Sequence, residues 1–371
     1  GSPSSMIFSP LLNSLVLYVA MQSLPSARVI ESQKLIMIPA KTLSRQVPRW
    51  QRELARAITD PAELLRELEL DPALLSAARV AAARFSLRVP RGFVARMTKG
   101  DPDDPLLRQI LPLGVELEAT PGFVTDPVGD QAAQAAPGVL HKYHGRALLI
   151  VTGACAVHCR YCFRREYPYA DSHAGVDEWR PALAYLAGDS SLREVILSGG
   201  DPLSLSDRRL GALLAALDRI PHLERLRIHS RQTIVLPERV DGGLLDLLAQ
   251  TRLRPVLVVH ANHPREIDAA VRAALTRLAE AGVTLLNQSV LLRGVNDSAA
   301  VLAELSEALF AARVLPYYLH LLDPVRGAAH FDVNKTEASA MIKTLRQRLP
   351  GYLMPRLVRE QPGQLAKTPV G

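Results

Sequence analysis

Cysteine is almost absent from this chain of 371 residues. It has three cysteines, Cys155, Cys159 and Cys162, and all of them fall within one short segment. This arrangement excludes the dispersed disulfide framework of a small secreted protein, because any pairing would leave one thiol over. The segment therefore points to a metal centre rather than to disulfides.

Blocks of basic residues and long apolar runs are also missing. The net charge of +7 is spread along the chain, which favours a solvated surface over nucleic-acid binding. The apolar run Met6–Met21 is short for a membrane span and lacks the basic start of a signal peptide. We therefore expect no nucleic-acid partner and no membrane association. A reducing cytoplasm would suit an oxygen-sensitive metal centre.

The cysteine spacing is C-x3-C-x2-C, within Gly-Ala-Cys-Ala-Val-His-Cys-Arg-Tyr-Cys-Phe. Three thiolates are one fewer than a [4Fe–4S] cluster takes when the protein ligates every iron, so the fourth iron would be open to a substrate or cofactor. A structural zinc site with His158 as fourth ligand is the alternative. Such zinc sites normally use two separated ligand pairs, so the spacing favours the cluster.

The N-terminal part of the chain reads as a tail followed by helices. Residues 1–35 resemble an expression tag and a poorly ordered tail, without a functional role. Residues 36–138 form a helical region in which connecting loops rich in Pro, Gly and Asp run from Val89 to Gly138. Helical spacing of leucine and charge predicts three helices, over Trp50–Ile58, Pro61–Leu68 and Asp71–Phe85.

From residue 139 to 349 short apolar runs alternate with amphipathic stretches. Six such units predict an α/β fold with a parallel sheet, since each crossover helix covers one face. Periodicity does not decide between a partial barrel and an open wound sheet, but both place an active site beyond the carboxyl ends of the strands. The expected strands are Ala147–Val151, Glu194–Leu197, Leu226–His229, Pro255–His260, Thr284–Val290 and Val314–Leu321. The expected helices are Glu178–Leu186, Asp207–Asp218, Gly243–Ala249, Pro264–Ala281, Ser298–Ala311 and Glu337–Arg348.

Polar motifs follow the expected strands at those carboxyl ends. The cysteine segment follows the first strand, and Gly199-Gly200-Asp201-Pro202, which by itself would be a turn, follows the second. The later strands are followed by the remaining motifs, which are Ser230-Arg231, His260-Ala-Asn-His263, Asn287-Gln288-Ser289 and Asp323. Loops gathered at one rim are what an active site needs.

These motifs together resemble the lysine 2,3-aminomutase family of the radical S-adenosylmethionine superfamily. The resemblance covers residues 90–371 and rests on Cys-Arg-Tyr-Cys-Phe-Arg-Arg, Leu-Ser-Gly-Gly-Asp-Pro-Leu, His-Ala-Asn-His-Pro, Asn-Gln-Ser-Val-Leu-Leu-Arg-Gly-Val-Asn-Asp and Lys-Thr-Pro. The sequence ends four residues after Lys367, as in the short branch that acts on elongation factor P. The resemblance implies a partial (β/α)6 TIM-like barrel over residues 139–349 and a cofactor-binding C-terminal segment over residues 350–371.

The resemblance also implies the cofactors. Cys155, Cys159 and Cys162 would hold a [4Fe–4S] cluster, and S-adenosylmethionine would bind the open iron and yield a radical that abstracts hydrogen from the substrate. A reductant protein would supply the electron. The residues implied at S-adenosylmethionine are Ser198, Gly199, Gly200 and Asp201, with His260 and Gln288 near the cofactors.

Pyridoxal phosphate is the second implied cofactor, because amine migration is eased when the nitrogen is held as an imine. Lys367 would form the Schiff base, although alone it reads as a solvated lysine in a chain end. Lys142, Tyr143 and Arg146 match the positions that hold the phosphate. Lys142 stands where stand-alone family members have arginine, and in isolation it also reads as part of a solvated basic patch.

Three charged residues match the family's substrate positions. Arg164 would bind the substrate carboxylate, and Asp323 and Glu360 would face its distal ammonium; in isolation Asp323 reads as a turn residue and Glu360 as a surface charge. We therefore expect conversion of L-lysine to (R)-β-lysine, which a ligase attaches to elongation factor P. Alternatives are an aminomutase for arginine or ornithine and a non-catalytic iron–sulfur protein. Electron carriers normally close all four ligand positions, which argues against the last.

Overall fold

The computed structural model describes residues 47–169 and 179–370. The expected N-terminal tail, residues 1–35, lies outside the described residues. Within the described ranges, no helix is both long and apolar enough to cross a membrane. All described residues belong to one compact unit that starts at Val47, so the expected segments from residue 47 onward share one body.

The centre of this unit is a ten-stranded sheet whose strands follow chain order. Seven neighbouring strands run parallel, and β1, β2 and β10 pair antiparallel at the two edges. The strands are β1 (Gln134–Ala136), β2 (Val139–Tyr143), β3 (Arg146–Thr152), β4 (Glu194–Gly199), β5 (Arg225–Ser230), β6 (Arg254–Val259), β7 (Thr284–Val290), β8 (Leu315–His320), β9 (Arg356–Arg359) and β10 (Thr368–Pro369). The six expected strands are confirmed as β3 to β8.

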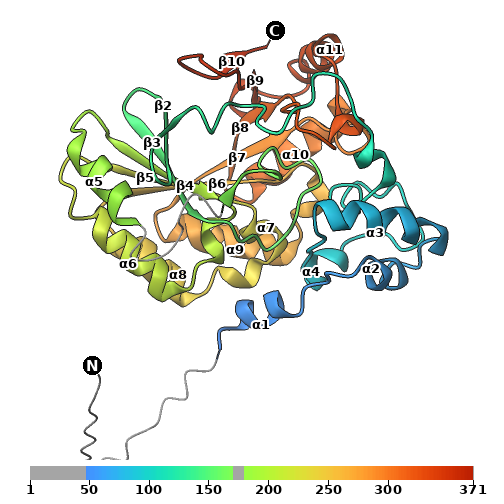
Figure 1. Cartoon of the computed structure of the whole chain (residues 1–371), viewed down its shortest axis with the longest axis horizontal. Helices are drawn as coiled ribbons and strands as arrows, with labels where there is room; N and C mark the ends of the chain where they lie inside the picture. The colour runs from blue at the N-terminus through green and yellow to red at the C-terminus, as the bar shows by residue number, and fades with distance from the viewer. Residues whose placement is uncertain (1–46, 170–178, 371) are drawn as a thin grey trace, which may run out of the picture. The chain divides into compact units, whose positions relative to one another are not determined.

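Helices cover one face of the parallel strands. Alternate strand residues such as Leu149, Leu197 and Ile228 share a buried core with these helices, which Figure 1 shows gathered along the sheet. Asp, Ser or Asn side chains cap the starts of several of them. The crossover helices are α5 (Arg180–Gly188), α6 (Asp207–Leu217), α7 (Gln232–Val235), α8 (Gly242–Gln250), α9 (Ala269–Glu280), α10 (Ala299–Ala311) and α11 (Lys335–Leu345).

The opposite face of the strands lines a cavity instead of a second helical layer. A doubly wound sheet would bury both faces under helices, so the chain forms an open, partial (β/α)6 barrel. Strand residues that alternate with the helix-facing ones, among them Ile196, His229 and His320, line this cavity. The period of two along each strand therefore separates the structural core from the candidate site.

The N-terminal helices pack beside the cysteine segment. The bounds are α1 (Arg49–Ala55), α2 (Pro61–Glu67), α3 (Leu75–Arg84) and α4 (Arg91–Val94), and Figure 1 shows α2, α3 and α4 grouped together. Their core contains Trp50, Leu64 and Phe93, and it also takes in Ala156 and Val157 from between the first two cysteines. The helical region therefore supports the loop that carries the cysteines.

The C-terminal segment adds to the sheet. Strand β9 pairs parallel with β8, and β10 returns antiparallel on β9, with Thr368 opposite Arg359. The sequence pattern did not predict these strands. β9 consists of only the four residues that follow Pro355, which are too few for a recognisable alternation of apolar and polar residues.

Candidate active site

A cavity of ≈ 710 Å³ opens at the carboxyl ends of the parallel strands. It is lined by the cysteine loop after β3, by Gly199–Asp201 at the end of β4, and by residues at or just beyond the carboxyl ends of the later strands, up to Asp323 after β8. Lys367 and Glu360 from the C-terminal hairpin close another wall. Every residue that the sequence singled out for catalysis or binding, from Lys142 to Lys367, lines this one cavity.

The cysteine loop is fixed by a buried cluster of ion pairs. Glu116 accepts two hydrogen bonds from Arg160, at 2.8 and 2.6 Å, and one from Arg165 at 2.7 Å. Arg160 and Arg165 flank Cys162 on the loop, while Glu116 comes from the N-terminal region. A carboxylate shared by two guanidiniums in a buried place holds the loop backbone firmly.

Two of the thiols, those of Cys155 and Cys162, lie in an environment that opposes their ionisation. Burial, together with Asp201 and the other two cysteines, raises the pKa of Cys155 well above its ordinary value. Burial and Cys159 raise the pKa of Cys162 to about 11. Thiols of this kind need a strongly cationic centre before they can bind as thiolates. The donor set fits an iron–sulfur cluster.

His158 does not turn toward the cysteines as a fourth ligand would. Its Nδ1 lies 2.9 Å from the carbonyl oxygen and 3.0 Å from the hydroxyl of Ser86, and its ring stacks on Phe85. In the described parts of the chain, no three His, Cys, Asp or Glu side chains converge as ligands of a single metal ion. The geometry weighs against the zinc alternative, whereas a tetranuclear cluster takes one thiolate per iron.

The two glycines after β4 are required by the chain's own backbone. A Cβ on Gly199 would lie 2.6 Å from the Thr152 carbonyl oxygen, and one on Gly200 would lie 2.4 Å from that of Ala154. Gly199 also has φ of +110°, which L-residues rarely adopt. These glycines let the end of β4 approach the start of the cysteine loop. The fold therefore requires glycine here, in addition to the expected role at S-adenosylmethionine.

Asp201 organises the loops of the neighbouring strands. Its carboxylate accepts hydrogen bonds from the Ser230 hydroxyl at 2.8 Å and from the backbone amide of Arg231 at 2.8 Å, and also from Leu203 and Gln232. Burial nevertheless raises its pKa. The carboxylate thus joins the end of β4 to the end of β5 and fixes Arg231 beside the cysteines.

The C-terminal hairpin brings Lys367 and Glu360 together. Glu360 follows β9 and Lys367 precedes β10, so the antiparallel pairing sets their side chains face to face. The Lys367 Nζ lies 2.6 Å from Glu360 Oε2. Burial alone would raise the pKa of Glu360, but Lys367 and Lys142 outweigh it and lower it to about 2. Neither residue is the solvated surface charge that each would be in isolation.

A row of side chains with alternating charge continues from this pair across the cavity. Lys142 Nζ contacts Glu360 at 3.0 Å and Asp130 at 2.6 Å, and Asp130 in turn accepts from Arg164 Nε at 2.7 Å. Arg164 also donates to the Ser198 hydroxyl at 3.0 Å. Burial opposes ionisation of Asp130, but Arg164 and Lys142 lower its pKa. The two carboxyl groups of this row, Asp130 and Glu360, therefore stay ionised between their basic neighbours.

Several buried polar atoms in the cavity have no partner among the described residues. They are Asp323 Oδ1 and the Nε2 atoms of His229, His260 and His320. Burial and then Glu360 raise the pKa of Asp323 to about 7. Burial and Arg231 lower the pKa of His260 to about 4, so its ring is neutral. Unpartnered buried groups are costly, so this wall fits a polar ligand such as an amine-bearing cofactor or substrate.

The residues expected at a phosphate lie on the hairpin between β2 and β3. Burial, with Glu360 nearby, raises the pKa of Tyr143, which therefore remains a neutral donor. The Arg146 guanidinium lies over the Tyr143 ring at 4.7 Å and contacts the His144 carbonyl at 3.4 Å. Arg146 and Arg227 border both this cavity and a neighbouring one lined by further arginines. The wall is cationic, as a phosphate site requires.

Sequence reasoning missed several residues of the site. Asp130 lies in a stretch of glycine, proline and aspartate without a motif, and nothing in that stretch signals its pairing with Arg164. His229 and His320 could have been found, since each is polar at a cavity-facing position near the carboxyl end of a strand. Arg227, two residues before His229 on β5, faces the same side and carries the same signal.

The comparisons with known proteins agree with this geometry. The family description "Radical SAM superfamily" matches residues 149–305. The chain is 52% identical over 322 residues to the L-lysine 2,3-aminomutase of Escherichia coli K12, covering 86% of this chain and 94% of the relative. The enzyme of the same name from Haemophilus influenzae is 46% identical over 332 residues, covering 90% and 98%. The L-lysine 2,3-aminomutase of Clostridium subterminale is 38% identical over 280 residues, covering 75% of this chain and 67% of the relative.

The partial barrel, the three-cysteine loop and the matching domain define a radical S-adenosylmethionine enzyme. Within that class, the chain belongs to the lysine 2,3-aminomutase family, whose members are isomerases. The family's cofactors are a [4Fe–4S] cluster, S-adenosylmethionine and pyridoxal 5′-phosphate, and the thiol, cationic and unpartnered polar groups of the cavity fit them.

Proposed function

We propose that this enzyme converts L-lysine to (R)-β-lysine by moving the amine from C2 to C3. One observation carries the proposal, namely that the lining of a single cavity includes the Arg164 guanidinium, the acidic side chains of Asp323 and Glu360, and Lys367. A lysine substrate has the complementary groups, a carboxylate, a distal ammonium and an amine to be moved. The similarity to relatives named L-lysine 2,3-aminomutase supports the same substrate.

Arg164 is proposed to bind the substrate carboxylate. Its Nε and Nη1 are already engaged by Asp130 and Ser198, which orients the guanidinium and leaves the remaining nitrogen for an incoming carboxylate. Asp323 and Glu360 are proposed to hold the distal ammonium. Glu360 is compensated by two lysines, whereas Asp323 has an unpartnered oxygen and is therefore the stronger candidate for a new contact.

The remaining roles concern the cofactors. When bound, the cluster and S-adenosylmethionine supply the hydrogen-abstracting radical, and pyridoxal phosphate activates the migrating amine. We assign Cys155, Cys159 and Cys162 to the cluster and Lys367 to the pyridoxal. Lys142, Tyr143 and Arg146 are assigned to the phosphate. The other proposed cofactor contacts are Ser198, Gly199, Gly200, Asp201, His260 and Gln288.

The test is an anaerobic assay of the reconstituted enzyme with a panel of amino acids. Lysine, ornithine, arginine and glutamate are offered in turn with a one-electron reductant, and the products are resolved by chiral chromatography. We expect β-lysine of the R configuration from lysine and little product from glutamate, since the acidic pair repels a second carboxylate. Preferred turnover of ornithine or arginine would favour the alternative cationic substrates, and preferred turnover of glutamate would refute the substrate assignment.

We further propose that the product serves the modification of elongation factor P in the cytoplasm. The support is the resemblance of the motifs to the branch that acts on elongation factor P, together with 52% and 46% identity to the Escherichia coli and Haemophilus influenzae relatives against 38% to the Clostridium subterminale enzyme. Incubation of the enzyme and lysine with elongation factor P and its lysyl ligase should attach β-lysine to that protein, which hydrolysis followed by chiral chromatography identifies, because lysine and β-lysine have the same mass. Equal modification without the enzyme, from lysine alone, would contradict this role.

A further inference from the structure

The sulfur of Cys159 has a contact that sets it apart within the cysteine loop. The Arg231 Nη1 donates a hydrogen bond to it at 2.8 Å and another to the Tyr161 hydroxyl at 2.7 Å. Arg231 follows β5 and is only 4% exposed. A buried guanidinium thus lies directly against one of the three thiols.

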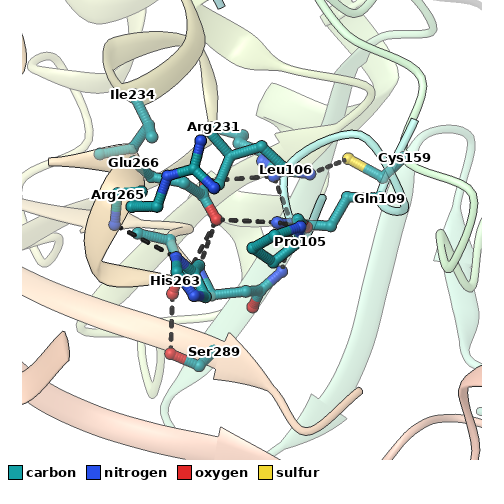
Figure 2. A network of polar contacts seen from close by, with 12 residues as sticks. Pro105, Leu106, Gln109, Cys159, Arg231, Ile234, His263, Arg265, Glu266 and Ser289 are labelled. Carbon is teal, nitrogen blue, oxygen red and sulfur yellow. Dashed lines mark hydrogen bonds and ion pairs between the residues drawn. The ribbon is translucent and has the colours of Figure 1, made fainter. Parts of the chain in front are cut away.

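The other edge of the guanidinium is held by a polar network. Arg231 Nη2 donates to Gln109 Oε1 at 2.6 Å and to Glu266 Oε2 at 3.1 Å, as Figure 2 shows. Glu266 is itself fixed by Gln109 Nε2 and by the backbone amides of Asn262 and His263. Because every partner is buried, the guanidinium keeps one orientation, with its Nη1 directed at the sulfur.

Tyr161 belongs to the same network. Its hydroxyl accepts hydrogen bonds from Arg231 and from Asn262 Nδ2, each at 2.7 Å. Because Arg231 Nη1 donates both to this hydroxyl and to the Cys159 sulfur, Tyr161 helps to hold the guanidinium against the sulfur. Cys155, in contrast, lies near the Asp201 carboxylate. The loop therefore surrounds its thiols unequally: Cys162 has Arg164 and Arg165 in its surroundings, but among the described residues the guanidinium hydrogen bond to a thiol is the one that Cys159 accepts from Arg231.

We propose that Arg231 is a positioning residue that raises the reduction potential of the iron–sulfur cluster through Cys159. The proposal rests on the assignment of Cys159 as a cluster ligand made above. Hydrogen bonds and positive charge at a ligand sulfur favour the reduced, more negative cluster. Arg231 therefore makes it easier for the cluster to accept the single electron that starts catalysis, and Tyr161 adds a smaller effect in the same direction.

The test is a reductive titration of anaerobically reconstituted protein, followed by electron paramagnetic resonance of the reduced cluster. In Arg231→Gln, we expect the ratio of reduced to oxidised cluster at a fixed potential to fall about tenfold, or about 59 mV for one electron. Tyr161→Phe, which keeps the ring but removes the hydroxyl that accepts from Arg231, should lower the ratio by roughly threefold. Arg231→Lys keeps the charge, so its ratio of reduced to oxidised cluster should lie between those of the wild type and of Arg231→Gln.

The matched control is Arg239→Lys. Arg239 is equally buried and ion-paired with Asp207, but it stacks on Trp50 outside the cysteine loop. Arg239→Lys should lower the free energy of unfolding but leave the reduction potential of the cluster unchanged. An unchanged potential in Arg231→Gln would overturn the proposal; if that variant fails to hold a cluster, an unchanged potential in Tyr161→Phe would overturn it. Because the readout requires no amino acid, a wrong substrate would leave this result intact.

Discussion

The two ends of the cavity are built in different ways. The cysteine end comes from one loop of consecutive residues, anchored by the buried Glu116 carboxylate and by Arg231. The Lys367 end is assembled from β2, β9 and β10 and from Asp130, which are distant in sequence and joined by alternating charges. Polar atoms without a partner among the described residues, Asp323 Oδ1 among them, line the same cavity.

This difference separates two tasks. A fixed local template suits a metal cluster, whose geometry is the same for any substrate. A wall of paired and unpartnered charges suits recognition, because a ligand gains most where it satisfies groups that the protein leaves without partners. We therefore expect changes at the cysteine end to abolish radical formation, and changes at the Lys367 end to alter cofactor and substrate binding.

The largest effect should come from removing the reactive side chain at either end. Cys162→Ala and Lys367→Ala should each lower lysine turnover by at least about 10⁴-fold, the scale seen when a reacting group is removed. Only Cys162→Ala should lose the iron–sulfur absorbance, and only Lys367→Ala should lose the pyridoxal absorbance. Lys343→Ala, an exposed lysine in α11, is the control. Loss of both absorbances in either variant would contradict this separation, because it would mean that the two ends of the cavity do not bind their cofactors independently.

The next effect is on stability at the cysteine end. Glu116→Gln leaves Arg160 and Arg165 buried without their carboxylate, and should lower the free energy of unfolding by about 3–5 kcal/mol. Urea unfolding of the cluster-free protein measures it. A loss under about 1 kcal/mol would mean that these ion pairs do not hold the loop.

Asp323→Asn probes recognition at the other end. Loss of a charged partner for the substrate ammonium should lower kcat/KM for lysine by roughly 10- to 150-fold. This factor corresponds to a loss of about 1.5–3 kcal/mol in transition-state stabilisation. The cluster spectrum and the cleavage of S-adenosylmethionine should remain. An unchanged kcat/KM would remove Asp323 from the substrate site.

The same carboxyl predicts a pH dependence. The pKa of Asp323 is raised to about 7, so the carboxylate that attracts the ammonium is lost as the pH falls through that value. Wild-type kcat/KM should drop about tenfold from pH 6.5 to 5.5, because one protonation is involved. A pH profile of Asp323→Asn should lack this step. If both proteins show the same slope, another group is titrating.

The smallest effect should come from an ion pair outside the site. Glu337 accepts from Arg293 at 2.7 Å, and both side chains are 46% exposed. Glu337→Gln should change the free energy of unfolding by less than about 1 kcal/mol, because solvent screens such pairs. A loss as large as that of Glu116→Gln would contradict the argument from burial.

The sequence reveals the cysteine end more readily than the Lys367 end for a physical reason. A C-x3-C-x2-C loop keeps its ligands adjacent along the chain, and strand β5 shows its period of two. The partnership of Asp130 with Arg164 and Lys142 depends on how β2, β3 and the loop before them pack. The partner-free nitrogens of His229 and His320 depend likewise on the closing of the barrel. No local pattern records such contacts.

The most direct test of the shared cavity uses L-lysine deuterated at C3. Since the amine moves from C2 to C3, a hydrogen must leave C3, and a radical formed beside the cysteines must reach it. Mass spectrometry of the 5′-deoxyadenosine released under anaerobic reduction should show deuterium alongside deuterated β-lysine. Cleavage of S-adenosylmethionine with no deuterium in either molecule would contradict a single site that joins the cysteines to Lys367.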